Sequence, residues 1–145
     1  LLSGLKILSD HNDYENIYSI DGSIFNLRRM NVNPSIIFVI SSFSNISEIL
    51  EKNLVMMSKK SQIALINVVD DSDFEIPEIG RLIVGFRNKR YQINTFNKKA
   101  IDRYRQNFEK NYKQLEKLSN RLRAKLINVN TKDDPVKTLM IGMRK

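Results

Sequence analysis

The sequence predicts an α/β domain of three layers, with a mainly parallel sheet between helices and an added β-hairpin. Two short runs rich in β-branched residues, 36–40 and 63–69, are typical of strands that are buried on both faces. A segment with helical spacing of apolar residues separates them, which predicts a right-handed strand–helix–strand unit. We therefore expect the two strands to lie side by side and to point the same way.

The elements around these strands follow from capping and breaking residues. Residues 1–33 are predicted to form an N-terminal helical segment, with Ser23 as the cap of a short helix, ahead of an α/β core over 34–145. The helix between the two strands is predicted to begin with Asn45 as its cap and Glu48 reaching back to it. All of these pieces are expected to belong to one domain.

The second half of the predicted core contains a hairpin, a long helix, a strand and a last helix. Short apolar segments at 82–84 and 91–93 flank a basic turn, which predicts the hairpin. Apolar residues recur at helical spacing over 100–126, with basic residues on the other faces. The run 126–129 predicts a third parallel strand, and Asp134, followed by proline, is predicted to open the last helix.

Composition narrows the setting and the chemistry. The 145 residues include no cysteine, so disulfides and thiolate catalysis are excluded. No apolar stretch approaches the roughly 20 residues that cross a bilayer, and no signal peptide is recognisable, so we expect a cytoplasmic chain. Because residue 1 is leucine, we expect the chain to be a piece of a longer protein, whose other parts could tether it to a membrane.

Charge is distributed unevenly along the chain. The net charge is +8, yet residues 61–80 carry five acids and no base, whereas residues 81–145 carry 18 bases and five acids. This asymmetry indicates either an anionic partner or an internal match between the acidic segment and the basic C-terminal part.

The sequence offers no familiar catalytic centre. His11 is the only histidine and has no visible partner for a triad or a metal cluster. The five glycines form neither a dinucleotide fingerprint nor a phosphate-binding loop, and no serine nucleophile elbow is present. We therefore expect no enzymatic activity and no cofactor.

Polar and acidic residues follow the two predicted strands, at the edge where open α/β sheets place their ligands. The acidic segment after residue 69 has three interpretations: a solvated turn, a rim that binds a partner, or part of a cation site. The candidate interaction rim consists of Ser41, Ser42, Asp70, Asp71, Asp73 and Glu75.

The predicted long helix has two interpretations. Its basic residues are either a solvated amphipathic face or a surface that binds anions. Nucleic-acid binding is not favoured, because Tyr104 and Phe108 fall on the apolar stripe of the helix and not between its exposed basic residues. The candidate anion-binding face consists of Arg103, Lys110, Lys113, Lys117 and Arg121.

The order of these pieces over residues 20–145 resembles the C-terminal half of a bacterial domain-of-unknown-function family related to von Willebrand factor A domains. Strand and loop 36–43 resemble a segment where that family usually has Ser-Asp-Phe. Residues 69–80 resemble its Asp-Pro-x-Glu followed by Leu-Pro and Gly, and 130–135 resemble its Ser-Thr-Asp-x-Asp-Pro. The hairpin, and the helix near Asp102, occur in the same order.

This resemblance implies a von Willebrand A or Rossmann-like fold and a non-enzymatic protein-interaction module. Members of the family are typically encoded beside MoxR-type AAA+ ATPases, which implies such an ATPase as the partner, in the assembly or activation of other proteins. The metal-binding first-strand motif has no counterpart here, and Ser42 stands where the fourth-strand Asp is expected. Divalent cations prefer anionic oxygens, so no metal is expected.

The alternative function is electrostatic binding of nucleic acid or of an anionic membrane surface through the basic helix 100–126. A separate expectation concerns the strand 36–40, which lacks its usual neighbour if only half of the family's sheet is present. Proteins rarely leave such an edge open. We expect it to be covered by residues 1–18 or paired with another copy of the chain.

Overall fold

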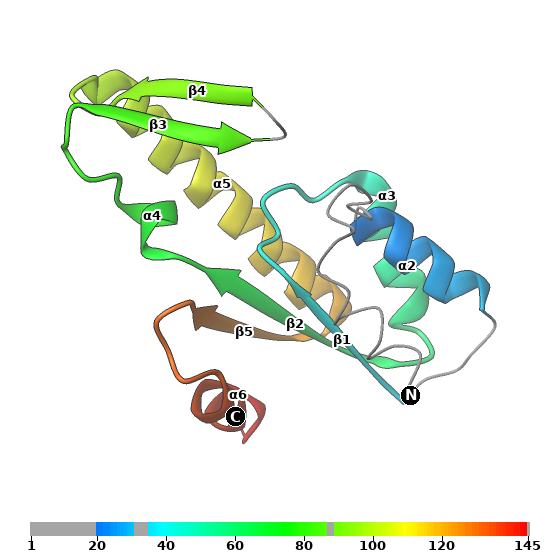
Figure 1. Cartoon of the computed structure of the whole chain (residues 1–145). Coiled ribbons are helices and arrows are strands. Elements are labelled where there is room, and N and C mark those ends of the chain that lie inside the picture. Colours follow the sequence, from blue (N-terminus) through cyan, green and yellow to red (C-terminus); the bar gives the residue numbers. More distant parts are fainter. Residues whose placement is uncertain (1–19, 31–34, 87–88, 145) are drawn as a thin grey trace.

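The computed structural model describes residues 20–30, 35–86 and 89–144, and Figure 1 shows their arrangement. The helices are α2 (Ile20–Arg29), α3 (Glu48–Met57), α4 (Asp71–Phe74), α5 (Lys98–Leu122) and α6 (Pro135–Arg144). The strands are β1 (Ile36–Ser41), β2 (Gln62–Val69), β3 (Arg81–Phe86), β4 (Lys89–Asn94) and β5 (Lys125–Asn130).

A three-stranded parallel sheet forms the centre of the fold, and its strand order is β1-β2-β5. Val39 of β1 lies opposite Leu65 of β2, which in turn lies opposite Leu126 of β5. The predicted α/β class and the parallel, adjacent pairing of the first two strands are therefore confirmed. The predicted hairpin is also present, as the separate antiparallel pair β3-β4.

Helices lie on both faces of the sheet, but the two faces are covered unequally (Figure 1). Helices α2, α3 and α5 pack on one face, in a core whose most deeply buried leucines include Leu50, Leu54, Leu65 and Leu115. Complete burial of one such leucine side chain contributes about 1.5–3 kcal/mol to the free energy of unfolding. On the other face, α6 packs on a much smaller core formed by Ile66, Ile127 and Val129.

The unequal coverage follows from the topology. Helix α3 connects β1 to β2, and α5 precedes β5, so both connections step across the sheet in the same direction. Two crossovers of the same hand that step in the same direction put their helices on the same face. Helix α6 follows β5 and is the helix that lies on the opposite face among the described elements.

Two predicted helix starts are wrong. Helix α3 is capped by Ser47, whose Oγ accepts a hydrogen bond from the Leu50 amide at 3.0 Å, and not by Asn45. The Ser47 hydroxyl also donates to the Asp21 carboxylate, so a contact between helices selects the cap. Helix α2 begins upstream of Ser23, which lies inside the helix.

The predicted end of the long helix is also wrong, whereas the start of the last helix is confirmed. Helix α5 ends at Leu122 because Arg123 adopts a left-handed conformation, with φ of 52°, and turns the chain into β5. Leu126 therefore belongs to the strand. Asp134 precedes α6, and its Oδ1 accepts a hydrogen bond from the Val136 amide at 2.9 Å.

Strand β1 presents an incompletely covered face. Residues that pair across parallel strands point to the same face, so Ile40 lies on the same face as Ile66 and Ile127. Phe38 and Ile40 are nevertheless 50% and 65% exposed, since the small core under α6 is built on β2 and β5. Among the described residues, β1 pairs with β2 alone. The predicted cover, residues 1–18, lies outside the described residues.

Helix α6 approaches the sheet through a glycine, which generates a test of this packing. A Cβ at Gly142 would lie 2.8 Å from Cγ2 and 2.9 Å from Cγ1 of Ile127, a buried side chain with restricted rotamers. We expect Gly142→Ala to lower the free energy of unfolding by about 1–3 kcal/mol through overpacking, measured by urea denaturation.

The control is the same substitution in an Ile127→Ala background, which removes the side chain that the new methyl group would meet. There, Gly142→Ala is expected to cause no loss. Stabilisation by Gly142→Ala in the unaltered chain, at the roughly 1 kcal/mol that alanine gains over glycine in a helix, would contradict the close packing of α6 on β5.

Candidate functional site at the carboxyl ends of the strands

The carboxyl ends of β2 and β5 meet at one edge of the sheet, where the acidic segment begins. Asp70 caps the short helix α4 in a reciprocal arrangement. Its Oδ1 accepts a hydrogen bond from the Ser72 amide at 3.0 Å, while its own amide donates to Oδ2 of Asp73 at 2.8 Å. Local sequence thus fixes the direction in which the acidic side chains leave the sheet.

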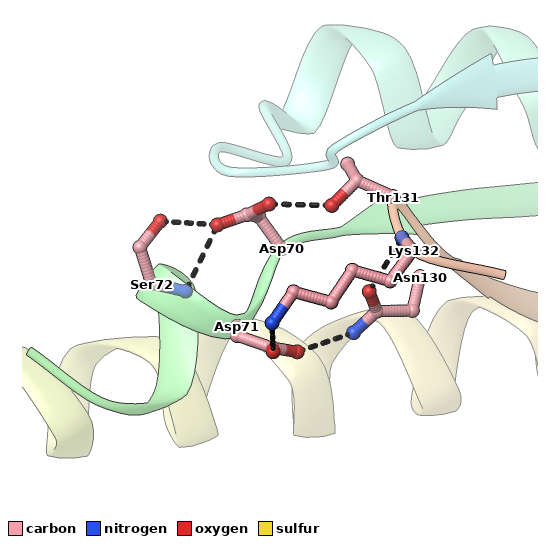
Figure 2. A network of polar contacts seen from close by, with 6 residues as sticks. All are labelled: Asp70, Asp71, Ser72, Asn130, Thr131 and Lys132. Atoms are coloured by element: carbon pink, nitrogen blue, oxygen red, sulfur yellow. Dashed lines mark hydrogen bonds and ion pairs between the residues drawn. The ribbon is translucent and has the colours of Figure 1, made fainter.

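The same acidic residues contact the loop after β5, as Figure 2 shows. The hydroxyl of Thr131 donates to the Asp70 carboxylate. Asp71 accepts a hydrogen bond from Asn130 Nδ2 at 2.8 Å and forms an ion pair with Lys132. We call these residues, together with Ser72, the acidic network. It ties the ends of β2 and β5 to each other.

The electrostatics of the acidic network stabilise its charged form. The Thr131 hydroxyl, followed by the hydroxyl and amide of Ser72, lowers the pKa of Asp70 from 3.8 to about 2. Lys132, followed by Asn130, lowers the pKa of Asp71, and the ion pair raises the pKa of Lys132. Because the pair is exposed, it adds little stability by itself. The internal match between the acidic and basic parts, one of the two predicted meanings of the charge asymmetry, is thus present locally.

A cavity of about 310 Å³ lies beside the acidic network, between the strand ends and α5. It brings together Ser42 and Asp73 of the predicted rim, which come from the loop after β1 and from α4. The remaining lining is aromatic and amide-rich. It consists of Phe43, Ser44, Asn67, Tyr104, Asn107, Phe108, Asn111, Tyr112 and Leu115.

One lining residue, Asn67, is a buried polar group inside the central strand. Its side-chain Nδ2 donates to Asn128 Oδ1 at 3.0 Å, and Asn128 Nδ2 in turn donates to the Tyr112 hydroxyl at 2.7 Å. The Asn67 Oδ1 has no hydrogen-bond partner among the described residues, although the residue is only 2% exposed. Sequence reasoning did not select Asn67. Asn67 could have been identified from the sequence because it is the one polar residue in the apolar run 63–69.

The predicted rim is divided between different environments. Asp70 and Asp71 belong to the acidic network, and Ser42 and Asp73 line the cavity. The Ser41 hydroxyl accepts a hydrogen bond from the Phe43 amide at 3.3 Å, which shapes the loop after β1. Glu75, the last member of the rim, lies at the end of α4 and is exposed.

The predicted anion-binding face is exposed on α5. Lys110, Lys113 and Lys117 line one shallow depression along the helix. Arg121 lies one turn further on and forms an ion pair with Glu51 of α3, while Arg103 is exposed nearer the start of α5. Three lysines of the five predicted residues therefore share one depression, which Glu109 also lines.

Comparisons with known proteins find no matching family model, no matching curated protein and no matching solved structure. Within residues 20–30, 35–86 and 89–144, no helix is long and apolar enough to cross a membrane. In the same residues, no group of three or more histidine, aspartate or glutamate side chains is arranged to hold a metal ion.

The acidic network predicts a pH dependence. Because the pKa of Asp70 is lower in the folded chain than its ordinary 3.8, ionised Asp70 stabilises the fold above about pH 4, and this stabilisation is lost as the pH falls towards 2. We expect Thr131→Val to raise the pKa of Asp70 towards its ordinary value, measured by NMR titration of the carboxyl carbon.

Ser72→Ala is the matched comparison, since the Ser72 hydroxyl is the second contributor and its amide remains in place. It should raise the pKa of Asp70 by less than Thr131→Val does. An unchanged pKa of Asp70 in Thr131→Val would contradict the contact between the two strand ends.

Proposed function

We propose that this chain is a non-enzymatic protein-interaction module that engages its partner through β1. The observation that carries the proposal is the state of that strand. Its side chains at Phe38 and Ile40 are half or more exposed, and it pairs on one side only among the described residues. Both properties are those of a surface that another chain covers.

The physical argument concerns two costs of leaving β1 uncovered. Among the described residues, no strand pairs with the side of β1 that faces away from β2, so its backbone amides and carbonyls form a template on which a further strand can add. Contiguous exposed apolar side chains are rare on proteins that have no partner. Strand β1 combines the two, since Ile36, Phe38 and Ile40 are exposed on the same face of an edge strand. Nothing in its sequence opposes pairing, because residues 36–41 contain no charge and no proline.

The partner we propose is a MoxR-type AAA+ ATPase, in the cytoplasm. This choice rests on the resemblance of residues 20–145 to the von Willebrand A-related family, whose members are typically encoded beside such ATPases. The loop after β1, at Ser41–Asn45, is continuous with the exposed strand and would enlarge the contact. Parallel pairing with β2 holds both in a fixed position.

Charge placed on the exposed face of β1 tests the proposal. We expect Ile40→Lys to weaken binding to a purified MoxR-type ATPase by tenfold or more, measured by isothermal titration calorimetry, because a desolvated lysine would enter the contact. The free energy of unfolding of the Ile40→Lys variant should differ from that of the unaltered chain by only about 0.5 kcal/mol, since Ile40 is 65% exposed.

The matched control is Ile49→Lys, where the side chain is 62% exposed on α3, a helix that packs on the face of the sheet opposite to Phe38 and Ile40. It should leave binding unchanged. Equal losses in the two variants, or no binding by the unaltered chain, would overturn the ATPase proposal. Dimerisation that is lost in Ile40→Lys, seen by sedimentation velocity, would instead identify a second copy as the occupant of β1.

A second candidate function is binding to an anionic surface through α5. The specific observation that favours it is the shared depression lined by Lys110, Lys113 and Lys117. Attraction of an exposed lysine to an anionic membrane is worth about 1 kcal/mol at low salt. This surface lies on α5, so it can be tested separately from β1.

For this second function, we expect Lys113→Gln with Lys117→Gln to weaken binding to phosphatidylserine vesicles by about thirtyfold, with a reduced salt dependence, measured by vesicle co-sedimentation. The control is Lys59→Gln with Lys60→Gln, which removes the same charge from two exposed lysines after α3. Equal effects of the two double variants would show that net charge, and not the α5 surface, is responsible.

A further inference from the structure

We propose that the cavity between the strand ends and α5 is a binding site for a flat organic cation, an amidinium or guanidinium group. The inference combines a buried unpaired acceptor, a carboxylate and aromatic walls in one cavity of about 310 Å³, at the lower end of the size of small-molecule sites. It does not rest on the proposed contact through β1.

The first observation is the free acceptor. The Asn67 amide is held in place because its Nδ2 donates to Asn128, which donates onward to Tyr112. Its Oδ1 is buried and has no hydrogen-bond partner among the described residues, and Asn67 is one of the residues that line the cavity. A buried acceptor without a partner is unfavourable, and a ligand that donates a hydrogen bond to it would remove this penalty.

The second observation is the sign of the charge. Asp73 is the one ionisable carboxylate in the lining, and no lysine, arginine or histidine accompanies it among the described residues. Its Oδ2 accepts a hydrogen bond from the Asp70 amide, which holds the side chain in position. Burial, and then the charge of Asp73, raises the pKa of Tyr104, so the phenol stays neutral beside it. Such a lining favours a cation and disfavours carboxylates and phosphates.

The third observation is the shape of the aromatic wall. The rings of Phe108 and Tyr112 lie one helical turn apart on α5, with planes inclined by 12° and centroids 6.5 Å apart. Phe74 packs edge-on against Phe108, with ring centroids 4.6 Å apart, and helps to hold that ring in place. Aromatic faces attract planar cations, and guanidinium and amidinium groups also offer several parallel donors. A spherical, strongly hydrated ammonium ion would use this wall less well.

The cationic group could belong to a free small molecule or to an arginine side chain of a partner protein. The chemistry recognised is the same in both cases. We therefore choose benzamidine as the first probe, with benzoate as a control of the same shape and opposite charge. Acetyl-arginine-amide is the second probe, because its blocked backbone mimics an arginine within a protein.

The experiment is an NMR titration of the full chain labelled with ¹⁵N. We expect benzamidine to bind saturably and to shift the side-chain amide signals of Asn67, while benzoate at equal concentration does not. Asp73→Asn retains an oxygen that can accept from the Asp70 amide but removes the charge, so it should weaken benzamidine binding by about tenfold. Glu75→Gln removes the same charge from an exposed neighbour that does not line the cavity, and should leave binding unchanged.

The outcomes separate the sources. Binding of both probes identifies an arginine side chain as a fitting occupant, and binding of benzamidine alone identifies a free small molecule. Absence of saturable binding by either probe, or equal weakening by Asp73→Asn and Glu75→Gln, would overturn the inference. Because Ile40→Lys does not touch the cavity, failure of this site and failure of the contact through β1 are distinguishable.

Discussion

The parallel pairing of β1, β2 and β5 is the constraint on which the other features depend. Since the three strands point the same way, their carboxyl ends converge on one edge of the sheet. Segments that are about 60 residues apart in sequence, such as Asp70 and Thr131, meet there for this reason. An antiparallel β5 would send its following loop to the opposite edge, and the acidic network would be lost.

The sequence was sufficient for features that depend on local pattern. Apolar runs identified β1 and β2, and the aspartate–proline pair identified the start of α6. It was insufficient where a contact between distant segments decides the outcome. Ser47 replaces Asn45 as a helix cap because Asp21, 26 residues earlier, bonds to it. The end of α5 depends on the left-handed conformation of Arg123, which cannot be predicted because arginine is not a residue type typical of that conformation.

The candidate site shows the same division. Sequence position correctly brought the acidic segment to the sheet edge, beside the loop after β1. It could not show that Asp70 and Asp71 are engaged by Asn130, Thr131 and Lys132, since those contacts need the third strand to be placed. Nor could it show that Asn67 keeps a free oxygen, because that follows from the partners of its nitrogen. The periodicity of the sequence indicates on which face of a strand or helix a residue lies. Tertiary contacts determine which of its polar atoms are left to bind a further group.

The small core under α6 has a consequence for the order in which the molecule opens. Helix α6 packs only two partly buried side chains, Leu139 and Met143, against three strand residues, whereas α2, α3 and α5 share one large core. Native proteins open in cooperative units whose free energies follow such differences. Amide hydrogens of α6 should therefore exchange with deuterium before those of α5. Each time α6 detaches, the exposed apolar surface of β1 would extend across the face of the sheet that α6 had covered, from Phe38 to Val129. Proteolysis and self-association would then both start from this one partly opened state.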